Sequence, residues 1–172
     1  GGVAKSVTAV AAHYCFSSLG YVTLAAECDT TNSIMSSTHE DVVFVTAGKP
    51  GWHTAIGVHL QRMGQPGGGD VMIFDTGARD EVHVRPKLDY FARCMAAVGG
   101  QVLVVRPITT SASAQRNAID FAKTTAGSDI ATVFMQVRAQ GRAEEHFARW
   151  SATESLRQAK KAGCVDTWID DL

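Results

Sequence analysis

Two kinds of hydrophobic pattern follow one another along the chain. In residues 3–19, small and apolar side chains recur at i, i+4 and i+7, and Gly20 can end that segment in a left-handed conformation. In residues 87–98, apolar side chains recur at the spacing that places them on one face of a helix. Two amphipathic helices are therefore predicted, whose core-facing residues are Ala4, Thr8, Ala11, Ala12, Cys15 and Leu19 in the first and Leu88, Phe91, Ala92, Met95 and Val98 in the second.

Four shorter segments are typical of β-strands. Residues 42–46 form a β-branched run, residues 53–60 alternate with period two, and residues 71–75 form a third run that ends before a Thr-Gly turn. Turns rich in Gly and Pro separate these three segments, so the pattern predicts an antiparallel meander. Residues 101–106 are the most continuous apolar run and are predicted to form a central strand.

The rest of the chain is predicted to be mostly helical. Residues 29–41 are polar and are expected to form a loop or a short helix, whereas helices are predicted over residues 113–125, 130–140 and 143–162. This order of elements predicts one α+β domain over residues 1–172, with a catalytic core over 1–110 and a helical extension over 111–172.

Composition narrows the class of protein. With 172 residues, 45% apolar and 19% charged, the chain can bury a core and does not have the composition of a disordered protein. Its 16 Lys and Arg against 17 Asp and Glu give a net charge of −1, so charge alone predicts no nucleic-acid partner. No apolar run approaches the ~18–20 residues of a membrane span.

The cysteines and glycines indicate no metal and no cofactor. The four cysteines form no CxxC pair, which argues against a zinc site. Residues 64–69 are rich in Gly but precede a strand and lack the Lys-Ser/Thr of a phosphate-binding loop. Each cysteine is expected to be a small buried side chain: Cys15, Cys28, Cys94 and Cys164.

One pair of polar residues in the predicted sheet suggests chemistry. His53 opens the alternating segment beside small side chains, and Asp75 closes the next predicted strand. On neighbouring antiparallel strands the imidazole and the carboxylate could meet, and a carboxylate that orients an imidazole is half of a nucleophilic triad. The alternative is that His53 is a partly exposed polar residue and that Asp75 is ordinary turn chemistry.

Two strings around these residues resemble the YopT-type cysteine proteases, bacterial secreted effectors with a papain-like fold. The strings are Gly51-Trp52-His53-Thr54-Ala55-Ile56-Gly57-Val58 and Met72-Ile73-Phe74-Asp75-Thr76-Gly77, in which Thr76 replaces the usual proline. The resemblance covers residues 1–106 and implies a nucleophile helix packed on an antiparallel sheet. It also implies His53 as the base and Asp75 as the orienting acid, while Trp52 is expected either to line the substrate cleft or to pack.

The family's nucleophile is a cysteine at the start of a helix, and Ala4 occupies that place in the string Gly1-Gly2-Val3-Ala4-Lys5-Ser6-Val7-Thr8. Either a catalytic cysteine has been replaced to silence the enzyme, or the domain is a natural pseudoenzyme. The alternative nucleophile, Cys15, lies about three turns away from the helix N-terminus that would stabilise a thiolate, so it is expected to belong to the core. Cys28 lies between two carboxylates, which disfavour its thiolate.

The expected function is therefore that of a secreted effector or toxin, a thiol protease that cleaves a protein of a host or rival cell. The same triad would also serve a peptidoglycan amidase, a glutamine deamidase or an acyltransferase. A catalytically dead protein-binding module is the alternative from another class. The expected partners are a protein substrate and an immunity or chaperone protein, without nucleic acid and without a membrane span.

Overall fold

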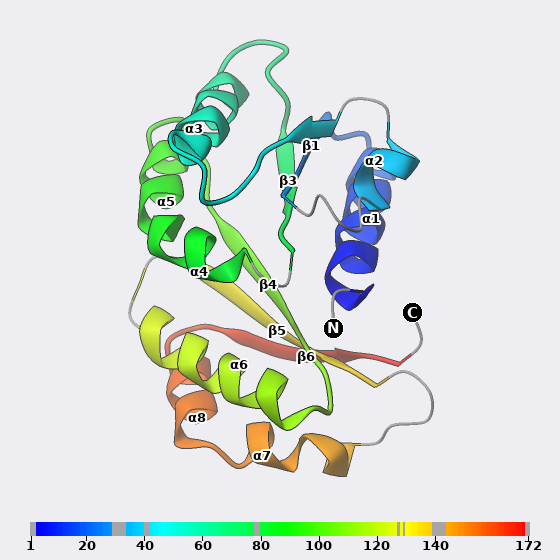
Figure 1. Cartoon of the computed structure of the whole chain (residues 1–172), viewed down its shortest axis with the longest axis vertical. Helices are drawn as coiled ribbons and strands as arrows, with labels where there is room; N and C mark the ends of the chain where they lie inside the picture. The colour runs from blue at the N-terminus through cyan, green and yellow to red at the C-terminus, as the bar shows by residue number, and fades with distance from the viewer. Residues whose placement is uncertain are drawn as a thin grey trace. The chain divides into compact units, whose positions relative to one another are not determined.

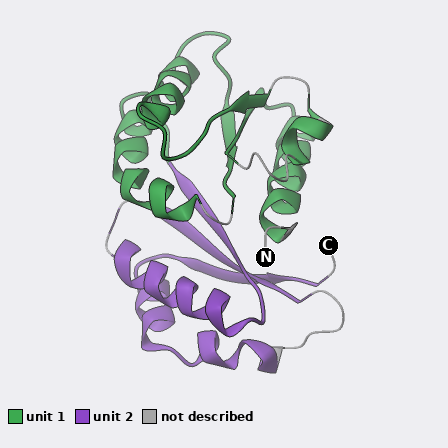
Figure 2. Ribbon diagram, viewed as in Figure 1, with its two compact units in different colours: residues 1–101 green, residues 102–172 purple. Residues whose placement is uncertain are grey.

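A computed structural model describes residues 3–28, 34–39, 42–77, 80–126, 128, 130–138 and 144–170. Gly1 and Gly2 of the nucleophile-like string and residues 29–33 of the predicted loop lie outside these ranges. The chain divides into two compact units, residues 1–101 and 102–172, and each is described by itself (Figure 2).

Unit 1 contains three strands and the helices between them (Figure 1). Its elements are α1 (Val3–Ser18), β1 (Thr23–Glu27), α2 (Ile34–Thr38), β2 (Val42–Phe44), α3 (Trp52–Met63), β3 (Val71–Asp75), α4 (Glu81–Val84), the 3₁₀ turn η1 (Arg85–Lys87) and α5 (Leu88–Ala96). The strands form a sheet in the order β2-β1-β3, and both pairings are parallel. The chain thus combines helices and strands as expected, but the predicted antiparallel sheet is wrong, and a papain-like arrangement is not confirmed.

The source of this error is the segment 53–60, which is helix α3 and not a strand. Ile56 and Leu60 are buried and four residues apart, a spacing that satisfies a helix face as well as strand alternation. Gly51 precedes the helix with a φ of 79°, a conformation that glycine adopts without strain. Because α3 connects β2 to β3, the two strands enter the sheet in the same direction.

Different helices pack on the two faces of the unit 1 sheet. Ala25 and Ile73 are neighbours in register, and they pack against Ala9 of α1 and Met35 of α2. One residue further along, the side chain of Phe74 points to the opposite face, where it contacts the aromatic side chains described with the candidate site. Figure 1 shows α1 and α2 on one side of these strands and α3 and α5 on the other.

The predicted core face of α1 is also wrong. Ser6 and Ala9 are buried, whereas Leu19 is 74% exposed and Cys15 is exposed. Helix α1 carries small or apolar side chains on most of its sides, so the sequence pattern alone did not decide which side packs. The prediction that Cys15 belongs to the core is therefore wrong.

Unit 2 is a second parallel sheet with helices on one face. Its elements are β4 (Leu103–Ile108), α6 (Ala112–Thr125), β5 (Ala131–Val137), the 3₁₀ turn η2 (Glu144–Phe147), α7 (Ala148–Ser151), α8 (Glu154–Lys161) and β6 (Val165–Ile169). The strand order is β4-β5-β6, so β5 and not β4 lies in the middle. Phe134 of β5 packs between Phe121 of α6 and Trp150 of α7.

The predicted helix over residues 130–140 is wrong, because residues 131–137 form strand β5, and β6 is a further strand in the part of the chain that was expected to be mostly helical. Residues 131–137 are almost continuously buried, and a short apolar run of this kind has no periodicity that distinguishes a strand from a buried helix. Two β-branched residues next to each other, Thr132 and Val133, favour the strand.

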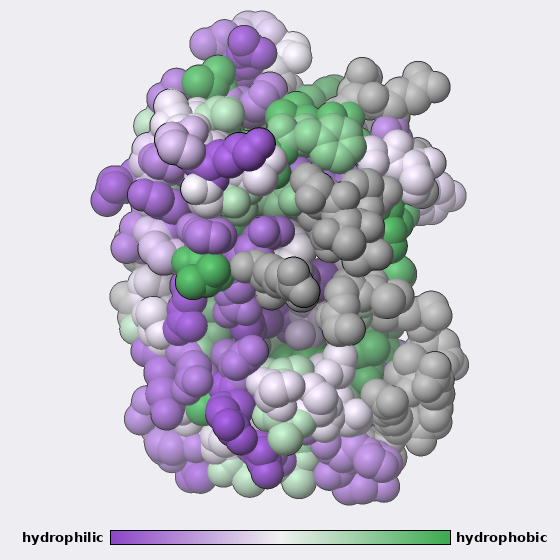
Figure 3. All heavy atoms as spheres, viewed as in Figure 1, coloured by the Kyte–Doolittle hydropathy of each residue, from purple (hydrophilic) through white to green (hydrophobic). Residues whose placement is uncertain are grey.

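The face of the molecule seen in Figure 3 carries both hydrophilic and apolar side chains. In unit 2, the face of the sheet that contains Leu103, Val105 and Val165 leaves these side chains at least 40% exposed. Within the described residues, no helix has both the length and the apolar character needed to cross a bilayer.

Candidate functional site

Two carboxylates lie side by side at the carboxyl end of the unit 1 sheet. Glu27 ends β1, Asp75 ends β3, and the two residues are partners in the register. Neighbouring strands are about 4.8 Å apart, and residues in register point to the same face, so both carboxylates project toward the α1 and α2 side. Glu27 is 0% exposed and Asp75 is 3% exposed, which is rare for acidic residues.

The strand ends are fixed by backbone hydrogen bonds. The Cys28 amide donates to the Asp75 carbonyl at 2.9 Å, and the Val45 amide donates to the Glu27 carbonyl at 3.0 Å. These bonds continue the ladder past the last strand residue. The positions of both carboxylates are therefore set by the sheet and not by a loop.

The Glu27 carboxylate is only partly satisfied. Oε2 accepts a long hydrogen bond, 3.3 Å, from the Ser36 amide of α2. Oε1 is buried and accepts no hydrogen bond from any residue that the structure describes. An unsatisfied buried polar group costs about 1–3 kcal/mol, and more if it is charged, so this oxygen calls for a proton or a cation.

The two strand ends also border a topological switch point. From β1 the chain continues to α2 on one face of the sheet, whereas from β3 it continues through α4 to α5 on the other face. In open parallel sheets, ligands bind in the crevice outside the carboxyl ends of strands whose connections diverge in this way. Glu27 and Asp75 occupy that position.

The first turn of α1 reaches the same end of the sheet. A short connection joins α1 to β1, and α1 contacts both β1 and β3, so the helix runs antiparallel to these strands (Figure 1). Glu27 and Asp75 lie two strand residues, about 6.6 Å, beyond Ala25 and Ile73, against which Ala9 of α1 packs. About four helical residues span the same distance, so the first turn of α1 lies level with the two carboxylates. The positive end of the α1 dipole thus favours the charged carboxylates.

A third acidic residue follows β3. Asp80 accepts a hydrogen bond from the Gly77 amide at 2.9 Å, which closes the turn after Asp75. Within the described part of the chain, however, no three His, Cys, Asp or Glu side chains converge on one point. The described site therefore supplies two protein carboxylates.

His53 lies in the first turn of α3, at the same end of the sheet but on the opposite face from Asp75. Its ring meets the edges of Trp52 and Tyr90, with centroids 5.9 Å and 5.3 Å away. Trp52 is 7% exposed and contacts Phe74 and Phe91, which is the packing role that the sequence left open. The expected strand-opening imidazole is thus a helix residue in an aromatic cluster.

Tyr90 completes the surroundings of His53. A Cβ at Gly57 would overlap the Tyr90 hydroxyl, so glycine at that position lets α5 approach α3. A hydrogen bond with the Cys94 thiol, and then desolvation, raise the pKa of Tyr90.

The remaining predicted residues fall in different places. Ala4 is half-buried in the first turn of α1, at the end of the sheet that carries Asp75. Cys15 is exposed near the far end of that helix, and Cys28 is buried at the carboxyl end of β1. The structure thus brings Ala4 and Asp75 to one end and one face of the sheet.

Glu27 is the residue of this site that sequence reasoning missed. It was considered only as a neighbour of Cys28, yet it follows the apolar run Leu24-Ala25-Ala26 as Asp75 follows Val71–Phe74. A carboxylate that ends a buried strand is the signal that could have found it.

Comparison of the chain with protein-family models, with curated proteins and with solved structures finds no match. The function of the site is therefore argued from its own chemistry.

Proposed function

We propose that unit 1 binds a divalent cation, Mg²⁺ by the chemistry of its ligands, between Glu27 and Asp75, and that the cation serves phosphoryl transfer on a phosphate-bearing substrate. The observation that carries this proposal is the buried Glu27 Oε1, which has no described hydrogen-bond donor and lies beside a second buried carboxylate. A cation shared by the two groups would neutralise both charges and supply the missing partner.

The type of ligand favours magnesium. Carboxylate oxygens are hard ligands that suit Mg²⁺, and Mg²⁺ is usually held by one or two protein carboxylates together with water and substrate phosphates. The two carboxylates of this site match that pattern, whereas zinc prefers nitrogen and sulfur ligands, and the described residues bring no His or Cys together with the two carboxylates into a group of three. The open coordination positions are then available to a phosphate.

The chemistry follows from the cation and the strand ends. When bound, Mg²⁺ would supply the positive charge that polarises a phosphoryl oxygen and offsets the charge that develops on the leaving oxygen. Glu27 and Asp75 would hold the cation, and the ladder bonds fix the backbones of both residues. The substrate would approach from outside the carboxyl ends of β1 and β3, at the switch point.

Cation binding is tested first with Mn²⁺, a paramagnetic substitute for Mg²⁺. Electron paramagnetic resonance should detect Mn²⁺ bound to the wild-type chain, and added MgCl₂ should displace it. In Glu27→Gln and in Asp75→Asn, which keep size and shape, the affinity for Mn²⁺ should fall at least tenfold. Asp89→Asn, at an exposed position of α5, is the matched control and should bind as the wild type does.

Catalysis is tested on the same four proteins with p-nitrophenyl phosphate and bis(p-nitrophenyl) phosphate, which distinguish monoesters from diesters. The wild type and Asp89→Asn should release p-nitrophenol only with added Mg²⁺ or Mn²⁺, and both site variants should be inactive. A wild-type chain that binds no Mn²⁺ at millimolar concentrations, or site variants that bind it equally well, would refute the cation site.

The thiol hydrolase implied by the family resemblance is a second candidate. Its support is the location of Ala4 and Asp75 at one end and on one face of the sheet; His53 lies at that end but on the other face. Ala4→Cys should then react with iodoacetamide at neutral pH faster than the exposed Cys15, and His53→Ala should abolish that difference. An equal reaction rate in both backgrounds would contradict this candidate.

A further inference from the structure

Two histidines from different elements of unit 1 meet ring to ring. His13 lies in α1 and His39 directly follows α2; their ring centroids are 3.7 Å apart and their planes are inclined by 35°. The His39 amide donates to the Met35 carbonyl at 2.9 Å, which ties His39 to the last turn of α2. The ring contact therefore joins α2 to α1.

The two rings differ in their polar partners. His13 Nε2 lies 3.0 Å from the Thr23 hydroxyl, which in turn lies 2.7 Å from the Ser17 hydroxyl. His39 Nε2 is buried and has no hydrogen-bond partner among the residues that the structure describes. A proton on His39 Nε2 would thus be buried without a described acceptor, and it would lie against a second imidazole.

Little described charge surrounds the pair to offset added protons. Helix α2 and strand β2 contain no charged residue, and α1 contains one cation, Lys5, two turns away from His13. The acidic groups of the packed elements lie at the two ends of the sheet, away from the rings or engaged elsewhere: Glu27, Asp75 and Asp70, which accepts a bond from the Val22 amide. Glu40 and Asp41 follow His39 in the sequence and lie outside the described residues.

We propose that the His13–His39 contact is a proton-sensitive latch, which holds α2 against α1 while both imidazoles are neutral and loosens it as the pH falls below about 6.5. Two protonated rings at this separation would repel each other, and each would lose hydration in the contact. The latch stands on the ring geometry and on the buried nitrogen, and it does not depend on the proposed cation site.

The sign of the pH dependence follows from linkage. Burial, and then the neighbouring His39, lower the pKa of His13 below its ordinary value. A group whose pKa is lower in the folded state contributes stability that is complete above its unfolded pKa, about 6.5, and is lost as the pH falls through the folded pKa. Acidification therefore weakens the contact of α2 with α1.

The loosening would reach the carboxylates through α2. The Ser36 amide, in the helix that the latch holds, is the donor to Glu27 Oε2. When α2 moves away, that bond is lost and the face of the sheet that carries Glu27 becomes accessible to solvent.

The test combines NMR titration with hydrogen exchange on the full chain. Between pH 7.5 and 5, the Cε1–H signal of His13 should titrate below its ordinary pKa of about 6.5, and the hydrogen-exchange protection factors of the α2 amides should fall about tenfold as the pH decreases. His39→Phe keeps a ring in the contact but cannot be protonated. It should make α2 protection nearly independent of pH.

His59→Gln, which removes an imidazole from α3 on the other face, is the control and should keep the wild-type pH dependence. Titration of His13 at its ordinary pKa of about 6.5, with unchanged α2 protection, would overturn the latch. That result can be read from the wild type alone, so it holds even if His39→Phe does not fold.

Discussion

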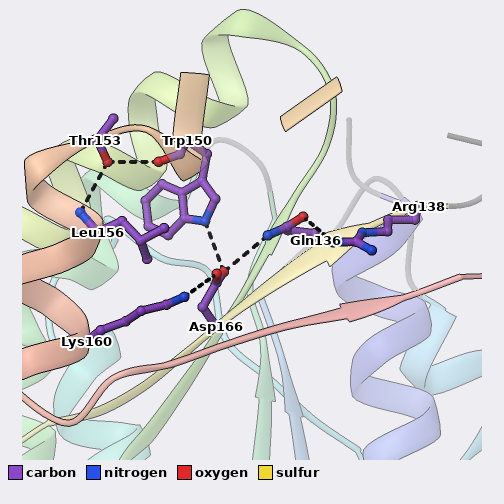
Figure 4. A network of polar contacts seen from close by, with 7 residues as sticks. All are labelled: Gln136, Arg138, Trp150, Thr153, Leu156, Lys160 and Asp166. Carbon is purple, nitrogen blue, oxygen red and sulfur yellow. Dashed lines mark hydrogen bonds and ion pairs between the residues drawn. The ribbon is translucent and has the colours of Figure 1, made fainter. Parts of the chain in front are cut away.

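Each unit buries a carboxylate, and the two carboxylates differ in how many hydrogen-bond and ion-pair partners the described residues give them. In unit 2, the Asp166 side chain is 9% exposed; its Oδ1 accepts hydrogen bonds from Trp150 Nε1 at 3.0 Å and from Gln136 Nε2 at 3.4 Å, while its Oδ2 pairs with Lys160 Nζ at 3.1 Å (Figure 4). In unit 1, Glu27 is fully buried, and its side chain accepts one long hydrogen bond from the residues that the structure describes.

The difference separates a structural carboxylate from a candidate functional one. A buried carboxylate whose oxygens all accept hydrogen bonds has a structural role, because it orders the side chains around it. A buried charge with an oxygen that lacks a described donor costs stability, and proteins retain such groups where a ligand or a proton completes them. The same residue class thus supports opposite conclusions in the two units.

The largest effect is expected from Asp166→Ala. The change leaves the indole N–H of Trp150, whose side chain is 0% exposed, without its acceptor, and it leaves Gln136 without one of its partners. We expect a loss of about 3 kcal/mol in the free energy of unfolding, measured by urea denaturation. Asp170→Ala, at an exposed position after β6, should cost less than about 0.5 kcal/mol. A cost below about 1 kcal/mol for Asp166→Ala would remove the distinction between the units.

A smaller loss is expected from Gln115→Ala in α6. Its side-chain amide donates to the carbonyls of Thr110 and His146 at 3.1 Å and 2.9 Å, and its oxygen accepts from the Trp150 amide at 2.9 Å. Because the residue is 3% exposed, alanine leaves these backbone groups without that partner and opens a cavity. The expected cost is about 2 kcal/mol, with hydrogen exchange increasing first in α7. Unchanged α7 protection would show that the glutamine only fills space.

Part of this architecture was predictable from sequence periodicity. The patterns that predicted α1, α5, α6, β2 and β3 rest on local spacing, and the structure confirms these elements to within a few residues. In unit 1, the predicted strand over residues 53–60 failed, because the four-residue spacing of Ile56 and Leu60 fits a strand and a helix equally. Once residues 52–63 are helical, the connection between β2 and β3 becomes a crossover and the sheet becomes parallel.

The candidate site depended on that same segment. Asp75 was singled out correctly as the carboxylate that ends a strand, but its partner was expected to be His53 because a strand was expected there. In a parallel sheet, the neighbour of Asp75 is the residue that ends β1, which is Glu27. The sequence could mark Glu27 as a carboxylate that follows an apolar run, but it could not place Glu27 beside Asp75, because strand order and register are properties of the folded chain.

Glu27→Gln should give a change of the opposite sign from the changes in unit 2. Without divalent ions, a neutral amide is cheaper to bury than a carboxylate with an unsatisfied oxygen, so the variant should be about 1 kcal/mol more stable than the wild type. Thermal unfolding in EDTA and in 10 mM MgCl₂ measures the stability of both proteins without and with the cation. Mg²⁺ should stabilise only the wild type. If Glu27→Gln is instead destabilising by 2 kcal/mol or more in EDTA, Glu27 is a structural carboxylate like Asp166.

Lys160→Met should have the smallest effect, and it tests which donors satisfy Asp166. The lysine side chain is 52% exposed, so solvent screens its attraction to Oδ2, whereas the donors to Oδ1 come from a buried tryptophan and a buried glutamine. Methionine retains the apolar stem and removes the charge. The expected cost is about 0.5 kcal/mol at low ionic strength, decreasing further in 0.5 M NaCl because salt screens an exposed ion pair. Urea denaturation at the two salt concentrations measures this difference. A cost of 2 kcal/mol that does not change with salt would mean that the Lys160 ammonium is the main partner of Asp166. The difference between Asp166 and Glu27 would then be the presence of one lysine.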